Sequence, residues 1–236
     1  MAPGPHTDGV GLPRCAVCGR LMTLTGFVTP NGELICHRHA HEQPSTCCGL
    51  PADPTLAAER PLCPRCAATA VRTQQDVRRV LPPIAARLRA LSIWTTKPVR
   101  VRLVPVAELQ ADWHGSGALL GGTVCVGSEV VDLMVVRDLP LVRFGAVVAH
   151  EVMHAYLVQH GFGELPPPVE EGLCELLAHA WLKGEPGAPA EWERRRIMDN
   201  PDPVYGNGFR AARQAALRVG GVSRMLAHVR RYGDLP

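Results

Sequence analysis

The chain has 236 residues, of which 46% are apolar and 20% are charged, and its net charge is +3. This composition is typical of a globular protein of one or two domains, and so small a positive charge gives little reason to expect a nucleic-acid binder. Residues 1–11 have neither the basic start nor the apolar segment of a signal peptide. No apolar run is expected to reach the ~18 residues that span a membrane. We therefore expect a cytoplasmic protein without a membrane partner.

Most of the nine cysteines lie in the first third of the chain, at spacings typical of zinc ligands. After a Pro/Gly-rich tail at 1–13, which is predicted to be disordered, Cys15 and Cys18 form a zinc knuckle. Cys36 and His39 follow, and the segment before them is typical of a hairpin that turns at Asn31-Gly32. Because the hairpin returns Cys36 to the knuckle, these four residues predict a closed, structural zinc site.

A second structural zinc site is predicted with its ligand set left open. Cys63 and Cys66 form another knuckle, and Cys47 and Cys48 lie upstream of it. Adjacent cysteines bind one ion awkwardly, so the remaining ligand has four candidates: Cys47, Cys48, His41 and Asp53. Two zinc sites in about fifty residues resemble a LIM domain, which predicts a zinc-binding module over 14–70. The resemblance is incomplete, because the first site pairs a Cys with a His and the second lacks its first CxxC.

The remaining residues, 71–236, are predicted to form one mainly helical domain with a short β-sheet. Residues 67–91 have a helical pattern that the proline pair at 82–83 is expected to divide. Residues 99–104 alternate as a half-buried strand, and 130–136 is a second strand candidate. We assign 130–136 as a sheet edge that an extended substrate can join. Helices are expected near 189–199, 208–219 and 221–231.

Residues 141–159 form an apolar run of helical length that contains His-Glu-Val-Met-His. Residues four apart lie on one face of a helix, so His150 and His154 can bind a single zinc ion. Glu151 lies beside them and can remove a proton from water that the zinc activates. The alternative is a buried helix that carries two structural histidines.

A catalytic zinc usually has three protein ligands, and a second predicted helix at 169–183 can supply the third. Zinc peptidases of the gluzincin type use a glutamate at about this separation, often just before a glycine. Glu171-Gly172 resembles that position, with sixteen residues between His154 and Glu171. Glu170 points about 100° away on the same helix and is the weaker candidate.

Three further residues are assigned to the site. Glu175 and His179 share a helix face with Glu171, and they either orient a zinc ligand or form a solvated stripe. Tyr205 lies in a Gly-rich segment, predicted to be a loop, from which it can reach the site. It is the first candidate donor to the developing oxyanion, and His179 is the alternative. Two cysteines with apolar neighbours are predicted to be core residues: Cys125 and Cys174.

Five segments match those of one known family and follow one another in the same order: residues 35–48, AHEVMHAYL, PVEEGLCELLAHAWL, PVYGNGFRAARQA and the closing LAHVRRYGDLP. In these the chain resembles the plant "DA" proteins, LIM-domain, ubiquitin-activated peptidases that limit organ growth, and their shorter bacterial relatives. The resemblance implies zinc ligands at His150, His154 and Glu171 and a general base at Glu151. The small size and the Ala, Arg, Pro and Gly content favour a bacterial member.

The expected fold is α+β, with a LIM-like double zinc-finger module followed by a gluzincin-like metallopeptidase domain. The expected function is zinc-dependent hydrolysis of peptide bonds in protein substrates, with one catalytic and two structural zinc ions and a module that docks a substrate or partner. The alternative is a LIM-like binding scaffold whose third zinc is structural. The ubiquitin-interacting motifs of the plant proteins have no counterpart in the sequence, so we do not expect dependence on ubiquitin.

Overall fold

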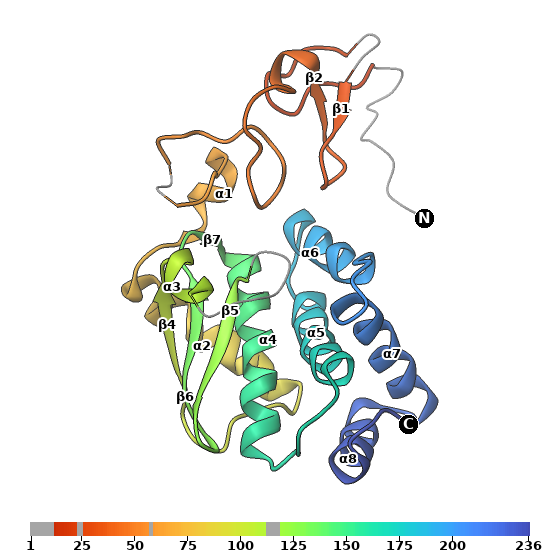
Figure 1. Cartoon of the computed structure of the whole chain (residues 1–236). Coiled ribbons are helices and arrows are strands. Elements are labelled where there is room, and N and C mark those ends of the chain that lie inside the picture. The colour runs from red at the N-terminus through yellow and green to blue at the C-terminus, as the bar shows by residue number, and fades with distance from the viewer. Residues whose placement is uncertain (1–11, 23–25, 57–58, 112–118) are drawn as a thin grey trace. The chain divides into compact units, whose positions relative to one another are not determined.

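The computed structural model describes residues 12–22, 26–56, 59–111 and 119–236, so most of the predicted tail lies outside the described residues. The fold is α+β, and the chain divides into two compact units (Figure 1). The first unit ends at Ala70 and also includes Asp138–Pro140. The second unit comprises Val71–Arg137 and Leu141–Pro236.

The first unit has little regular structure. Strands β1 (Gly26–Val28) and β2 (Leu34–Cys36) form the predicted hairpin, and Gly32 has the positive φ of 80° that its turn requires. A 3-10 turn, η1 (His37–His39), follows directly, and the short helix α1 (Pro64–Ala68) contains the second knuckle. Two-residue strands, β3 (Ala70–Val71) and β7 (Leu139–Pro140), pair with each other.

The sheet of the second unit has three strands in the order β4-β6-β5. Strand β4 (Arg100–Val104) is parallel to β6 (Glu129–Val136), and β5 (Gly121–Val126) is antiparallel to it. The prediction that 130–136 forms the sheet edge is therefore wrong, because this strand is the central one. It pairs with a strand on each side, four of its apolar residues (Val130, Leu133, Val135 and Val136) are buried, and the Gly-rich segment before it forms the outer strand β5.

Helix α2 (Gln74–Ala90) runs without interruption through Pro82 and Pro83, which were expected to divide it. Each proline removes one backbone hydrogen bond from the helix. Packing on both sides of the pair offsets this loss, because Val77 and Ile84 are buried. A capping box between Thr73 and Asp76 fixes the start of the helix. The helical pattern from 67 thus corresponds to the end of α1, a break and α2. A short helix, α3 (Val106–Gln110), follows β4.

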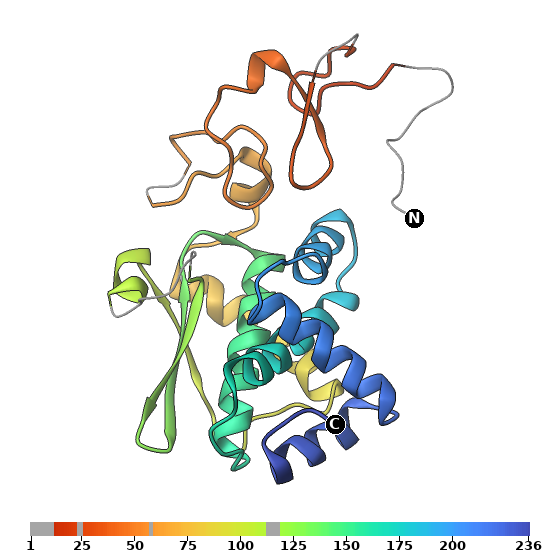
Figure 2. The same ribbon diagram turned by 45° about the vertical axis from the view of Figure 1, so that its right-hand side comes forward.

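Helix α4 (Leu141–Gln159) has the predicted bounds and packs between the sheet and α5 (Pro167–Lys183) (Figures 1 and 2). Helix α5 begins inside the proline run rather than after it. This is physically reasonable, since a proline in the first turn lacks only an N–H that would have no partner within the helix.

Three helices complete the second unit: α6 (Ala188–Met198), α7 (Tyr205–Arg218) and α8 (Val222–Tyr232). The segment at 205–208 was expected to be a loop, but it forms the first turn of α7. Its glycines serve close packing instead. A Cβ atom on Gly208 would collide with the carbonyl oxygen of Pro168, and one on Gly172 would collide with the backbone of Gly208. Helices α5 and α7 therefore cross with their backbones in contact.

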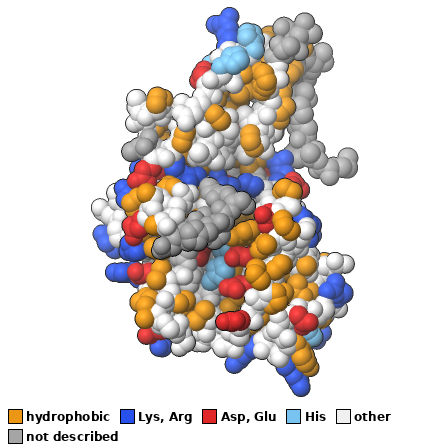
Figure 3. Space-filling model, in the orientation of Figure 1, with side chains coloured by type: hydrophobic (Ala, Val, Ile, Leu, Met, Phe, Trp, Pro, Cys, Tyr) orange, Lys and Arg blue, Asp and Glu red, His pale blue; other side chains and the backbone are white. Residues whose placement is uncertain are grey.

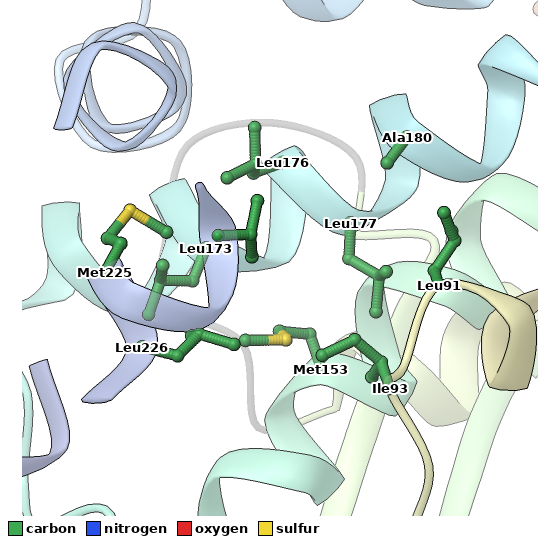
Figure 4. A pocket seen from close by; sticks show the side chains of 10 residues that line it. Leu91, Ile93, Met153, Leu173, Leu176, Leu177, Ala180, Met225 and Leu226 are labelled. Atoms are coloured by element: carbon green, nitrogen blue, oxygen red, sulfur yellow. The ribbon is translucent and has the colours of Figure 1, made fainter. Parts of the chain in front are cut away.

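An apolar cavity lies between α4, α5 and α8 (Figure 4). Met153 of α4, Leu173 of α5 and Met225 of α8 are among the residues that line it, and all three are buried. Met153 stands between the two histidines of the motif in sequence, and Leu173 follows Gly172. The sides of α4 and α5 that face away from the two histidines of the motif are thus buried in the core.

One described helix, α4, is long and apolar enough to cross a membrane by length and composition alone. The expectation that no apolar run reaches this length is therefore wrong. The signal is weak, because core helices pass the same test, and 56% of the most apolar window of α4 is buried within the fold.

The backbone contact between α5 and α7 predicts an unusual stability change. Gly208→Ala should lower the free energy of unfolding by ~1–3 kcal/mol, because the added methyl group overpacks the crossing. Alanine ordinarily stabilises a helix relative to glycine, so the sign is informative. Urea denaturation measures the change. Gly163→Ala is the control, since a Cβ there meets nothing within 4 Å. Equal stability of the two variants would contradict the close crossing.

Candidate metal centre

Helices α4 and α5 bring the predicted histidines and glutamate together. His150 and His154 lie one turn apart on α4, with ring centroids 5.2 Å from each other. Glu171 of α5 reaches between them. Its Oε2 is 3.1 Å from His150 Nε2, and its Oε1 is 3.7 Å from His154 Nε2. The Nε2 atoms of both imidazoles therefore face one carboxylate.

The other ring nitrogen of each histidine faces a second carboxylate. His150 Nδ1 is 3.5 Å from Glu175 Oε1, and His154 Nδ1 is 2.8 Å from Glu170 Oε1. The first contact agrees with the orienting role expected for Glu175. The contact between His154 and Glu170 gives Glu170 the same orienting position. The sequence did not predict this, because it indicates Glu170 only as the weaker candidate zinc ligand. Carboxylates in these positions fix the ring orientation of metal-binding histidines.

The donor set fits a divalent metal ion. Ligand atoms of four residues lie within 4.8 Å of one another: His150, His154, Glu171 and Cys174. Glu171 Oε2 is buried, and His150 Nε2 lies 3.1 Å from it without the geometry of a hydrogen bond. Burial alone would raise the pKa of Glu171, but the imidazole of His150 outweighs this and holds the pKa below its usual value. Two imidazole nitrogens and a carboxylate form the ligand set of many zinc sites.

Glu151 is buried next to the histidines but is not one of the clustered ligands. Its Oε2 accepts a hydrogen bond of 2.9 Å from the hydroxyl of Thr123 on β5. Burial raises the pKa of Glu151, while the positive charge of the neighbouring imidazoles lowers it. The carboxylate therefore lies at the site without occupying a ligand position.

Tyr205 reaches the site from the first turn of α7. Its ring centroid lies 6.3 Å from that of His150, with the two rings inclined by 30°. Burial, followed by the charge of Glu171, raises the pKa of the phenol, so its hydroxyl keeps its proton and can donate. The sequence predicted that Tyr205 can reach the site, but from a Gly-rich loop rather than from a helix.

His179 and Cys125 differ from their predicted roles. His179 is buried two turns beyond Glu171, with its ring against Phe209 at 5.0 Å between centroids. Burial and the charge of Lys183 lower its pKa to about 4, so the ring is neutral and belongs to the core. Cys125 was expected in the core but is exposed, because it lies near the end of the outer strand β5. Cys174 is buried as expected.

Acidic side chains gather around histidine surface on the visible face of the second unit (Figure 3). Four carboxylates lie beside the two imidazoles: Glu151, Glu170, Glu171 and Glu175. A positively charged ion is the partner that such a set favours.

The first unit contains the first predicted structural site. Ligand atoms of four residues lie within 4.8 Å of one another: Cys15, Cys18, Cys36 and His39. His39 Nδ1 is 2.6 Å from Glu42, which leaves Nε2 for the thiols. Backbone hydrogen bonding by Arg20 and the His39 ring lower the pKa of Cys18 to about 6, and thiolate is the form that binds zinc.

The second predicted site is formed in part. The sulfur atoms of Cys48, Cys63 and Cys66 lie within 4.8 Å of one another, and a hydrogen bond that the Cys66 thiol donates to Cys47 is the largest cause of the raised pKa of Cys66. Cys47 is thus adjacent to the cluster. The carboxylate of Asp53 accepts hydrogen bonds from Thr55, and His41 is exposed. Of the four candidates left open by the sequence, the two adjacent cysteines agree with the geometry.

Two site residues were missed because they lie on β5, which the sequence did not reveal as a strand. Thr123 bonds to Glu151, and a Cβ on Gly121 would lie 2.6 Å from Glu151 Oε1. The alternation of Gly121, Thr123 and Cys125 was a signal for a strand with one face toward the site. The many glycines in this segment obscured it.

Part of the chain is similar to known plant proteins. Residues 122–194 match the family model described as "DA1-like: Protein DA1". The chain is 32% identical over 156 residues to Protein DA1 of Arabidopsis thaliana, which covers 52% of this chain and 29% of that protein. It is also 32% identical over 139 residues to Protein DA1-related 1 of Arabidopsis thaliana, covering 46% of this chain and 25% of that protein.

A third relative is the LIM domain-containing protein HDR3 of Oryza sativa subsp. japonica, 27% identical over 144 residues, with 46% of this chain and 28% of that protein covered. The chain spans about a quarter of the length of the curated relatives that it matches. No solved structure gives a significant match. These relatives are plant proteins, and a bacterial origin for this chain stays a prediction. The matched segment contains His150, His154 and Glu171, and the chain is a relative of the DA1 family.

Proposed function

We propose that the protein is a zinc-dependent endopeptidase. One observation carries the proposal: the Nε2 atoms of His150 and His154 converge on Glu171, while Glu170 and Glu175 hold the Nδ1 atoms. Histidines that bind a catalytic zinc have this arrangement, because a carboxylate on the far nitrogen fixes the ring and increases its basicity. Three protein ligands leave one position for water.

The residues around the metal position are suited to peptide hydrolysis. Zinc, when bound, acidifies water toward a pKa of about 7 and polarises a carbonyl group. Glu151 takes one proton from the water, whose oxygen then attacks the peptide carbon. The C–N bond breaks as Glu151 passes the proton to the leaving amine. Tyr205, beside His150, can donate a hydrogen bond to the developing oxyanion.

An extended peptide can bind along β5. This strand pairs with β6 on one side and is the last strand of its sheet among the described residues. Among the residues that the structure describes, no strand pairs with its outer side, and a substrate would add there as a further strand. Because Thr123 of β5 bonds to Glu151, a peptide on this edge lies next to the general base.

We assign the first unit to docking of a substrate or partner protein, as LIM-like modules do. Its surface exposes Phe27 and Val28 of the hairpin. We place the protein in the cytoplasm, because none of the nine cysteines forms a disulfide and reduced cysteines persist in a reducing compartment.

A specific observation favours a second candidate function. Cys174 Sγ belongs to the same cluster as His150, His154 and Glu171, and a thiolate there would complete a tetrahedral site. The third zinc would then be structural, and the protein would be a binding scaffold. In that case Cys174→Ala would lower zinc affinity, and Glu151→Gln would change no measured property.

Different effects are expected from two neighbouring glutamates. Glu151→Gln should keep its zinc and its thermal stability but lose at least ~10²-fold in peptide hydrolysis, because it removes only the acid/base group. Glu171→Ala should lose zinc affinity and activity together, because it removes a ligand. Mapping of new protein termini in an extract identifies cleaved peptides, and rates on those peptides are then measured with zinc content. Glu164→Gln, an exposed glutamate, is the control.

Two outcomes would contradict these assignments. Unchanged termini after Glu151→Gln would exclude the peptidase. Full zinc content in Glu171→Ala, together with loss of zinc in Glu175→Ala, would show that the ligand lies one helical turn further along α5.

The three clusters predict three zinc ions per chain. Elemental analysis after purification without chelator should give a value near three. Replacing Cys15 and Cys18 with serine should remove one ion and unfold the first unit, since structural zinc supplies much of the folding free energy of such modules. Cys125→Ser is the matched control, because Cys125 belongs to none of the clusters. A value near two that Cys63→Ser does not change would show that the second structural site is empty.

A further inference from the structure

Strand β5 holds the side chain of Glu151 through one residue. The hydroxyl of Thr123 is 2.9 Å from Glu151 Oε2 and 3.2 Å from the backbone oxygen of Glu151. No other described residue forms a hydrogen bond with this carboxylate. Since Glu151 is only 5% exposed, the Thr123 hydroxyl replaces much of the hydration that burial removes.

Gly121 leaves the space that the carboxylate occupies. A Cβ at this position would lie 2.6 Å from Glu151 Oε1 and 2.9 Å from Glu151 Cγ. Gly121 and Thr123 point to the same face of β5, because residues two apart in a strand share a face. One residue thus makes room for the glutamate, and the next on that face holds it in place.

We propose that Thr123 is a positioning residue that fixes the Glu151 carboxylate for proton transfer. This inference rests on the proposed peptidase function. Thr123 engages Oε2 and leaves Oε1 to accept the proton of the water. A peptide would pair with the edge of β5. The same strand therefore positions both the substrate backbone and the general base. A misplaced base slows the proton transfer without weakening the binding of the peptide.

Substitutions that differ by one hydroxyl test the proposal. Thr123→Val keeps the shape of the side chain and should lower kcat by ~10-fold, the scale for loss of a hydrogen bond to a charged group, with little change in KM. Thr123→Ser should restore kcat to within about threefold, since it returns the hydroxyl. Thr96→Val is the matched control, because Thr96 also donates to a side chain of α4, Gln159 at 3.1 Å, away from the site. It should keep the wild-type kcat.

The substrate for these rates is a peptide identified by mapping of new termini. In a Glu151→Gln background, Thr123→Val should have no further effect on the rate, because both changes act through one carboxylate. An equal effect in both backgrounds, or failure of serine to restore kcat, would overturn the proposal. So would a loss of zinc from Thr123→Val, which would indicate a structural role.

A measurement without turnover separates this inference from the proposed function. If wild type cleaves no peptide in a Glu151-dependent manner, the peptidase is excluded. Crystal structures of zinc-loaded wild type and Thr123→Val still test the contact. A displaced or disordered Glu151 carboxylate in the variant supports the role of Thr123, and an unmoved carboxylate overturns it.

Discussion

The metal centre depends on the backbone contact between α5 and α7. Gly172 and Gly208 meet there, and neither has a side chain that would separate the helices. Helix α7 therefore begins beside α4, which brings Tyr205 next to His150. Glu171 directly precedes Gly172, so the same contact holds its carboxylate between the two imidazoles. A pair of glycines thus allows α5 and α7 to approach closely beside the site, to which α4, α5 and α7 all contribute residues.

The charges at this centre explain its need for a cation. Four carboxylates surround two imidazoles, and two of these carboxylates, Glu151 and Glu171, are largely buried. Even with both rings protonated, the negative charges exceed the positive ones. A divalent ion held by the two neutral imidazoles supplies the same two positive charges as two protonated rings, but at a single point beside the buried carboxylate of Glu171. The arrangement of the carboxylates also divides their tasks, since only Glu171 faces the Nε2 atoms.

The sequence predicted the features of the metal centre that belong to a single helix better than those that depend on contacts between elements. The apolar stripe and the i,i+4 spacing gave α4 and its histidines, because both are properties of one helix. The contact of Glu170 with His154 depends on how α4 and α5 pack, which one helix does not encode. The edge strand was assigned wrongly for the same reason: an apolar pattern identifies a strand such as β6 but not its neighbours. The glycines of α7 indicate a loop until the partner helix is known.

Cysteines make up half of the eight residues at the centre of the first unit: Cys15, Cys48, Cys63 and Cys66. In most domains, many interlocking apolar side chains restrict which substitutions a core accepts. Here a few sulfur atoms hold the core, so the positions between them are under little packing constraint. Such a module can diverge quickly in sequence while it keeps its shape. The family match covers 122–194, which includes none of the first unit's zinc clusters.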